Sequence, residues 1–161
     1  MQNEIVECVL AVARAEIGVR EESDNRGMRV TEYLRAAKMD PGNPWCAAFV
    51  AWCFSQAEAR LRLALPVPRT AYCPTLAAWA RKKGVLQDLP RVGDVFLHWG
   101  KAGKVHRFKH AGFVSSVRPN AFDTIEGNTR EGGTRGPDAV VALRRPIRDE
   151  YRFVRWIDAV G

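Results

Sequence analysis

The sequence lacks an apolar run long enough to span a membrane. Its longest such stretch, around Cys46–Phe54, is far shorter than the ~20 residues that a membrane-spanning helix needs. The chain also lacks the basic start and apolar segment of a secretory signal peptide, because its first residues are acidic and amphipathic, with Glu4 and Glu7. We therefore expect no membrane insertion and no standard secretion signal.

Histidine and cysteine are both scarce. The spacing of His98, His106 and His110 matches no tight zinc motif, although a zinc site built from them is an alternative. No two cysteines form a Cys-x-x-Cys pair. An even cysteine count would allow two disulfides, but a chain of 161 residues can fold without such crosslinks. We expect reduced thiols, no bound metal ion and no cofactor, with Cys8 and Cys53 as small core residues.

Positive charge is in excess, at +7, but it is spread along the chain. Only short clusters occur, at Arg81–Lys83 and Arg144–Arg145. Such a distribution favours polyanions weakly, or it serves as a solubilising surface. Because no helix-turn-helix, zinc-finger or RNA-binding motif accompanies the charge, we expect no nucleic-acid partner.

The pattern of apolar residues predicts helices followed by strands. Helices are expected from Ile5 to near Gly18, over Val30–Ala37, over Trp45–Phe54 with Pro44 in the first helical position, and over Pro74–Lys83. Strands are expected at Val95–Trp99, His110–Val117 and Phe122–Glu126, and near Ala139–Leu143 and Tyr151–Ile157, with Lys101–Lys109 as an exposed hairpin loop. This order predicts an α+β fold in which N-terminal helices pack on a C-terminal antiparallel sheet. We expect one domain over residues 1–161.

Cys46 is the strongest candidate for a reactive residue. A break ends just before it, where Asn43 is a favourable N-cap and Pro44 suits the first helical position. Cys46 then falls in the first turn, where free N–H groups and the helix dipole favour thiolate over thiol. The alternative is a buried structural cysteine, which is common for this residue type.

A nucleophilic cysteine needs a base within hydrogen-bond distance. His110 is favoured because it opens a strand and is followed by two small residues, whereas His98 lies inside a strand and His106 lies in the basic segment. The base needs an orienting acceptor, and both Glu126 and Asn128 lie at the end of the next strand. We favour Glu126, because a carboxylate also stabilises imidazolium.

Stabilising a tetrahedral intermediate also requires hydrogen-bond donors. The backbone N–H of Cys46 is a natural first donor. Asn25 is a candidate for the second, although a turn-forming role before Arg26–Gly27 is the simpler explanation of that asparagine.

Several segments together resemble CHAP-type amidases and peptidases. The resemblance extends over residues 15 to 158 and is carried by Pro44–Cys53, Gly93–Phe96, His110–Val114, Ile125–Asn128 and the loop Asn25–Gly27. It implies a papain-like CHAP fold that hydrolyses amide bonds in the stem peptides or cross-bridges of peptidoglycan.

By the same resemblance, Cys46 attacks, His110 acts as base and then acid, and Glu126 orients the imidazole. Asn128 is then a secondary catalytic residue, and Asn25 and Trp45 are expected to bind substrate. Some members of the family have an acidic calcium-binding loop before the cysteine. The segment Asp24–Gly27 lacks that repeat, so no metal is expected.

The resemblance implies an N-acetylmuramoyl-L-alanine amidase or a peptidoglycan endopeptidase, acting as a phage lysin or as a secreted antibacterial effector. We expect a monomer that is made in the cytoplasm and reaches the cell wall after release or delivery, with an immunity or delivery protein as a candidate partner. Three alternatives remain open: an NlpC/P60-type endopeptidase, whose motif is usually Asp-Cys-Ser, a cysteine protease acting on proteins, and a noncatalytic wall-binding or phage structural module.

Overall fold

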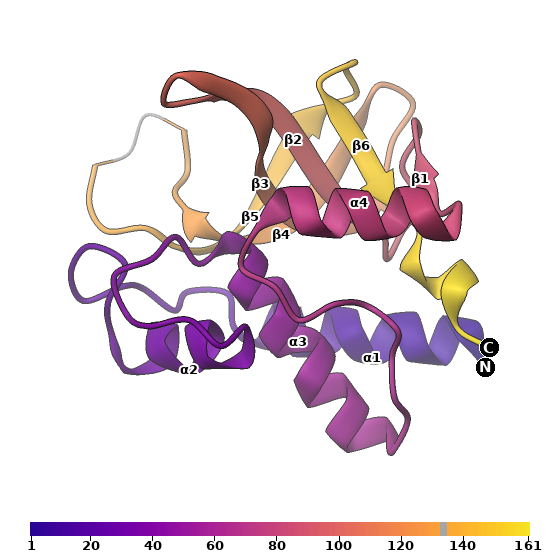
Figure 1. Ribbon diagram of the computed structural model, residues 1–161, viewed down its shortest axis with the longest axis horizontal. Coiled ribbons are helices and arrows are strands. Elements are labelled where there is room, and N and C mark those ends of the chain that lie inside the picture. The colour runs from indigo at the N-terminus through magenta and orange to yellow at the C-terminus, as the bar shows by residue number, and fades with distance from the viewer. Residues whose placement is uncertain (133–134) are drawn as a thin grey trace.

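Four helices precede a six-stranded sheet in the computed structural model, which describes residues 1–132 and 135–161 (Figure 1). The helices are α1 (Gln2–Ala15), α2 (Met28–Ala36), α3 (Cys46–Leu61) and α4 (Cys73–Lys83). The strands are β1 (Leu86–Gln87), β2 (Val95–Ala102), β3 (Val105–Val117), β4 (Ala121–Thr129), β5 (Ala139–Pro146) and β6 (Tyr151–Val154), and the 3-10 helix η1 (Trp156–Ala159) follows. The predicted α+β class is confirmed.

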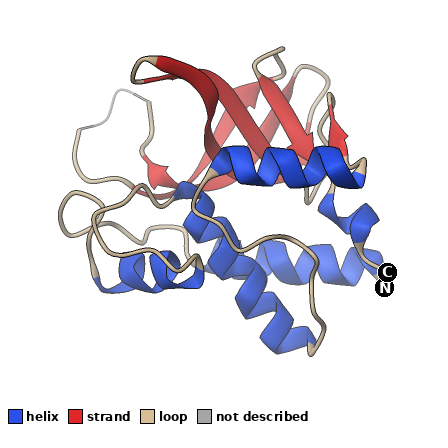
Figure 2. Cartoon of the chain, in the orientation of Figure 1, coloured by secondary structure: helices blue, strands red, loops and turns tan. Residues whose placement is uncertain are grey.

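The sheet is antiparallel throughout, with strand order β1-β6-β2-β3-β4-β5. Figure 2 shows the helices gathered at one side of it, with α4 lying across the strands. Among the described residues, no helix is both long and apolar enough to cross a bilayer. Helix α3 packs against the neighbouring strands β3 and β4, which carry the predicted base and acceptor.

Two apolar clusters lie on opposite faces of the sheet, as strand alternation requires. Phe113 faces the helices, where its ring lies 5.6 Å from that of Phe54. Val114 faces the other way, into a smaller cluster that includes Phe96 and Phe122. Cys46 belongs to the larger cluster, on the helix side of the sheet.

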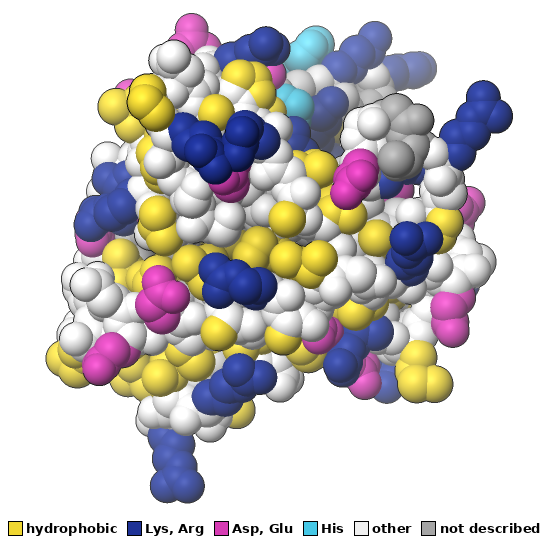
Figure 3. All heavy atoms as spheres, turned by 180° about the vertical axis from the view of Figure 1, so that it is seen from behind, with side chains coloured by type: hydrophobic (Ala, Val, Ile, Leu, Met, Phe, Trp, Pro, Cys, Tyr) yellow, Lys and Arg dark blue, Asp and Glu magenta, His cyan; other side chains and the backbone are white. Residues whose placement is uncertain are grey.

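The charge distribution agrees with the sequence pattern. Figure 3 shows Lys and Arg side chains scattered over the face opposite to the view of Figure 1, interleaved with acidic side chains, rather than gathered in one patch. On this face the positive charges form a diffuse field and no defined binding surface.

The prediction that Lys101–Lys109 forms an exposed hairpin is confirmed, but the loop itself is shorter than expected. Strands β2 and β3 continue through this segment as a hairpin, with Ala102 opposite Val105 and a turn at Gly103, whose φ is +63°. The exposed polar side chains suggested a loop, but strand pairing satisfies the backbone groups while leaving those side chains in water. The last predicted strand is shorter than expected, since η1 replaces its end, and β1 was not predicted.

The prediction that Asn43 caps the nucleophile helix is wrong. Helix α3 begins at Cys46 with Trp45 as its N-cap, and the side chain of Asn43 donates to the carbonyl of Asp40 instead. The free N–H of Trp45 donates to Oδ1 of Asn128 at 2.8 Å. The start of α3 is thus fixed from the end of β4, by a residue far away in sequence.

Gly127 allows this close approach of α3 to β4. A Cβ atom at position 127 would lie 2.6 Å from Cζ3 of Trp45 and 3.1 Å from Cβ of Phe49. Both neighbours are buried and anchored, so neither can move aside easily. The first turn of α3 packs against β4 because position 127 carries no side chain.

We predict that Gly127→Ala destabilises the protein by about 1–3 kcal/mol, because the added methyl group overpacks the contact with Trp45. Chemical denaturation measures this change. Gly132→Ala is the matched control, since a Cβ there meets no atom within 4 Å. Equal stability of the two variants would show that the α3–β4 contact is loose.

Candidate active site

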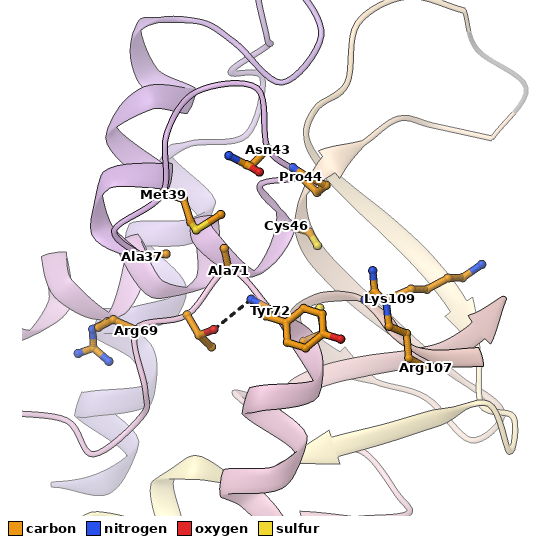
Figure 4. A pocket seen from close by; sticks show the side chains of 12 residues that line it. Ala37, Met39, Asn43, Pro44, Cys46, Arg69, Ala71, Tyr72, Arg107 and Lys109 are labelled. Atoms are coloured by element: carbon orange, nitrogen blue, oxygen red, sulfur yellow. Dashed lines mark hydrogen bonds between the residues drawn. The ribbon is translucent and has the colours of Figure 1, made fainter. Parts of the chain in front are cut away.

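Cys46 lies at the N-terminus of α3 and lines a cavity of about 310 Å³ (Figure 4). Its side chain is nearly buried, with 5% of the residue exposed. Tyr72 and Cys73, at the start of α4, line the same cavity. Two helix N-termini therefore meet at the sulfur, and their free N–H groups and dipoles both favour negative charge there.

The imidazole of His110 links Cys46 to Glu126. Its Nε2 lies 2.8 Å from Oε1 of Glu126, which leaves Nδ1 for the hydrogen bond that the ring makes with the Cys46 sulfur. The structure thus brings together the three residues that the sequence indicated as nucleophile, base and acceptor. Glu126, and not Asn128, is the acceptor on the imidazole.

Gly112 makes room for this arrangement. A Cβ at position 112 would lie 2.7 Å from both Cβ of Glu126 and Cε1 of Phe96. The absence of a side chain at Gly112, two residues after His110, therefore makes room for Glu126 beside the imidazole.

Glu126 is fully buried and is held by two groups besides the imidazole. Arg145 on β5 binds both carboxylate oxygens, with Nε 2.9 Å from Oε2, and Thr124 donates its hydroxyl to Oε2. Burial alone would raise the pKa of Glu126, but the hydrogen bonds from Arg145 and His110 outweigh it and lower the pKa to about 2. The carboxylate is therefore ionised at neutral pH despite its burial.

Arg145 and Thr124 were missed by sequence reasoning. Thr124 precedes Glu126 by two residues on the same strand, so strand alternation could have placed both on one face. Arg145 could not be found in this way, because its position depends on the register of β4 against β5, in which it lies opposite Phe122. Its neighbour Arg144 faces the other way and pairs with Asp123 at the surface.

The electrostatics favour a thiolate–imidazolium pair. The pKa of Cys46 is lowered well below its ordinary value, first by a hydrogen bond from Cys73 and then, against the effect of burial, by the hydrogen bond and charge of His110. Burial opposes the protonation of His110, but its hydrogen bonds to Cys46 and Glu126 raise its pKa to about 9. The arrangement therefore favours an ionised sulfur beside a protonated imidazole.

Cys73 is a contact of the nucleophile that the sequence did not reveal. It is the first residue of α4 and is almost completely buried, and its thiol donates to the sulfur of Cys46. That hydrogen bond, together with burial, raises the pKa of Cys73 well above its ordinary value. Cys73 therefore stays a neutral S–H donor beside a thiolate. All four cysteines are free, as expected.

The structure corrects the prediction that Trp45 binds substrate. Trp45 is completely buried, with its indole stacked on Tyr33 at 5.5 Å and its Nε1 donating to Glu21 at 3.2 Å. A side chain without exposed surface cannot contact a substrate in this conformation. Trp45 instead anchors the start of α3 in the core.

Asn128 and Asn25 support the same helix end from outside the cavity. Asn128 accepts from the N–H of Trp45 and donates to Oδ1 of Asn25 at 3.1 Å and to Asp138 at 3.0 Å. Its carboxamide is thus engaged away from the imidazole, which corrects its expected place beside His110. Asn25 does not line the cavity of Cys46, so it is not placed as the second oxyanion donor.

The other two histidines lie apart from this chain of contacts. His98 stacks on Tyr151 at 4.7 Å, and burial lowers its pKa. His106 lies exposed on the β2–β3 hairpin. Over residues 1–132 and 135–161, no group of three His, Cys, Asp or Glu residues could hold a metal ion.

A family model described as "CHAP domain" matches residues 38–128, which include Cys46, His110 and Glu126. No curated protein and no solved structure matches the chain.

We predict that Cys73→Ala moves the alkylation profile of Cys46 to higher pH by about one unit, because the thiolate loses a hydrogen-bond donor. Iodoacetamide labelling followed over pH, with mass spectrometry to assign the site, measures this shift. Cys8→Ala is the control, since Cys8 lies outside the cavity. Superimposable profiles for Cys73→Ala and the wild type would mean that Cys73 does not tune the nucleophile.

We predict that Arg145→Met destabilises the protein by about 3–5 kcal/mol, because it leaves the buried Glu126 carboxylate without its main partner. The adjacent Arg144→Met removes the same charge from an exposed position and should leave stability nearly unchanged. Denaturant titration compares the two. Adding Glu126→Gln to Arg145→Met should recover part of the loss, and a failure to recover would contradict the assigned pairing.

Proposed function

Because the chain belongs to the CHAP domain family, whose activity is that of an amidase or peptidase hydrolase, we propose that it cleaves amide bonds in peptidoglycan with Cys46 as the nucleophile. One observation carries the proposal. A continuous series of hydrogen bonds runs from the cavity through Cys46 and His110 to the buried carboxylate of Glu126. This series holds the parts that thiol-dependent acyl transfer needs.

In the first step the Cys46 thiolate attacks the carbonyl carbon, so that an S–C bond forms and the carbonyl oxygen becomes an oxyanion. The N–H of Cys46 lies ahead of the first hydrogen bond of α3, from Phe49 to Trp45, and is available to stabilise that charge. The imidazolium of His110 then gives its Nδ1 proton to the leaving amine. The C–N bond breaks, and an acyl thioester on Cys46 remains.

In the second step water replaces the amine. The neutral imidazole now takes a proton from water at Nδ1, and the hydroxide attacks the thioester carbon. The carboxylic acid leaves, and Cys46 returns as a thiolate beside imidazolium. Throughout, Glu126 holds Nε2 of His110, which keeps the ring in place and stabilises its charged form.

Membership of the family specifies neither which amide bond is cut nor the biological route by which the protein reaches the wall. We propose that the bond lies in a stem peptide or cross-bridge, and that the protein is a phage lysin or a secreted effector acting on the wall after release or delivery. The diffuse net charge of +7 favours contact with an anionic wall. An immunity or delivery protein is the proposed partner of the effector form.

We predict that purified sacculi release new peptide termini with the wild type and none with Cys46→Ala. Mass spectrometry of the products identifies the bond: a freed L-alanine amine means an amidase, and any other freed amine means an endopeptidase. Asn43→Ala is a suitable control, since it changes the same cavity without removing the thiol. Absence of products from walls of several chemotypes would favour a protein substrate or a noncatalytic role.

A further inference from the structure

The wall of the Cys46 cavity is positively charged. Arg69, Arg107 and Lys109 line it, and no carboxylate does. The N-termini of α3 and α4 add their own positive ends. The cavity therefore has more positive charge than the Cys46 thiolate and a neutral scissile amide need, and this excess favours a further anionic group.

Two of the three cations already have partners that direct them elsewhere. Arg69 forms an ion pair with Glu58. Lys109 donates from Nζ to the carbonyl of Lys101 at 3.3 Å, and its stem packs over Gly100. Figure 4 shows the Lys109 side chain extended away from the cavity. Arg69 is thus neutralised by a carboxylate, and Lys109 points away from the space beside Cys46.

Arg107 is different. Its guanidinium lies 5.2 Å from the centre of the Tyr72 ring, and one of its N–H groups donates to the carbonyl of Phe108 at 2.8 Å. Within the described part of the chain, no carboxylate pairs with it. The side chain is half-buried and held by an exposed aromatic ring. It therefore presents its remaining donors in a fixed orientation, at little further entropic cost.

A β-bulge accounts for this placement. His110 pairs with His98 and Phe108 pairs with Trp99, so Lys109 is an extra residue on β3 without a partner on β2. Such a bulge twists a strand and changes the direction of its side chains. It lies between Arg107 and His110, and both of these residues reach the region of Cys46.

We propose that Arg107, supported by Tyr72, binds a free carboxylate of the substrate close to the scissile amide. The guanidinium fork matches a carboxylate with two parallel hydrogen bonds, which a carboxamide cannot reproduce. The inference rests on the proposed function, in which the substrate is a stem peptide. Stem peptides carry carboxyl groups on their glutamyl and diaminopimelyl residues, and these occur either free or amidated. Arg107 thus selects for the free form.

The test uses two pairs of muropeptides, each pair identical except that one carboxyl group, glutamyl or diaminopimelyl, is either free or a carboxamide. For at least one pair we expect the wild type to prefer the free acid about 10-fold to 100-fold in kcat/KM. Arg107→Gln should bring that preference close to unity. Lys109→Gln removes the same charge two residues away on the same strand and should keep the preference.

Binding to Cys46→Ala, followed by calorimetry, tests the inference without requiring turnover. The free acid should bind about tenfold or more tightly than its amide, and Arg107→Gln in this background should abolish the difference. If the wild type cleaves both members of each pair equally and Cys46→Ala binds them equally, the carboxylate site is wrong while the proposed function stands. If nothing is cleaved but the binding preference is present, the proposed function fails and the carboxylate site stands. Unchanged thermal melting and iodoacetamide reactivity of Arg107→Gln verify that the fold and Cys46 are intact.

Discussion

The contact between the first turn of α3 and the end of β4 is the constraint on which the site depends. Trp45 packs on Gly127, and its backbone N–H at the start of the helix donates a hydrogen bond to Asn128. This contact fixes the position of Cys46 relative to a strand that also carries Glu126. A nucleophile and its acceptor residue, eighty positions apart in the chain, are thereby held on adjoining parts of one rigid core.

The side chains next to this contact form a largely buried series in which positive and negative charges alternate. Arg145 is positive, Glu126 negative, His110 positive and the sulfur of Cys46 negative, with the neutral thiol of Cys73 at the end. Each charge would be costly to bury alone, but each has an opposite charge or a donor as its neighbour. The arrangement therefore favours the ionised form of the series, in which the nucleophile is already a thiolate.

The fold and the cavity determine different aspects of function, namely the type of reaction and the choice of substrate. Membership of the CHAP domain family and the Cys46–His110–Glu126 series indicate what kind of reaction is available. The cavity wall determines which groups are accepted next to the sulfur. There the bulge at Lys109 precedes His110, and the guanidinium of Arg107 lies over the ring of Tyr72, where we propose that it binds a carboxylate.

Local sequence determined the features that depend on near neighbours. The order of helices and strands, the end of α4 at Gly84 and the place of Cys46 in a first turn all follow from periodicity and breaks, and two strand-borne residues could be identified as base and acceptor. Sequence gave the wrong cap at Asn43 and left Cys73 and Arg145 unassigned. Those features were decided only by the tertiary structure, because they require the packing of α3 on β4, the approach of α4 to α3 and the register of β5, and each of these brings together residues that are remote in the chain.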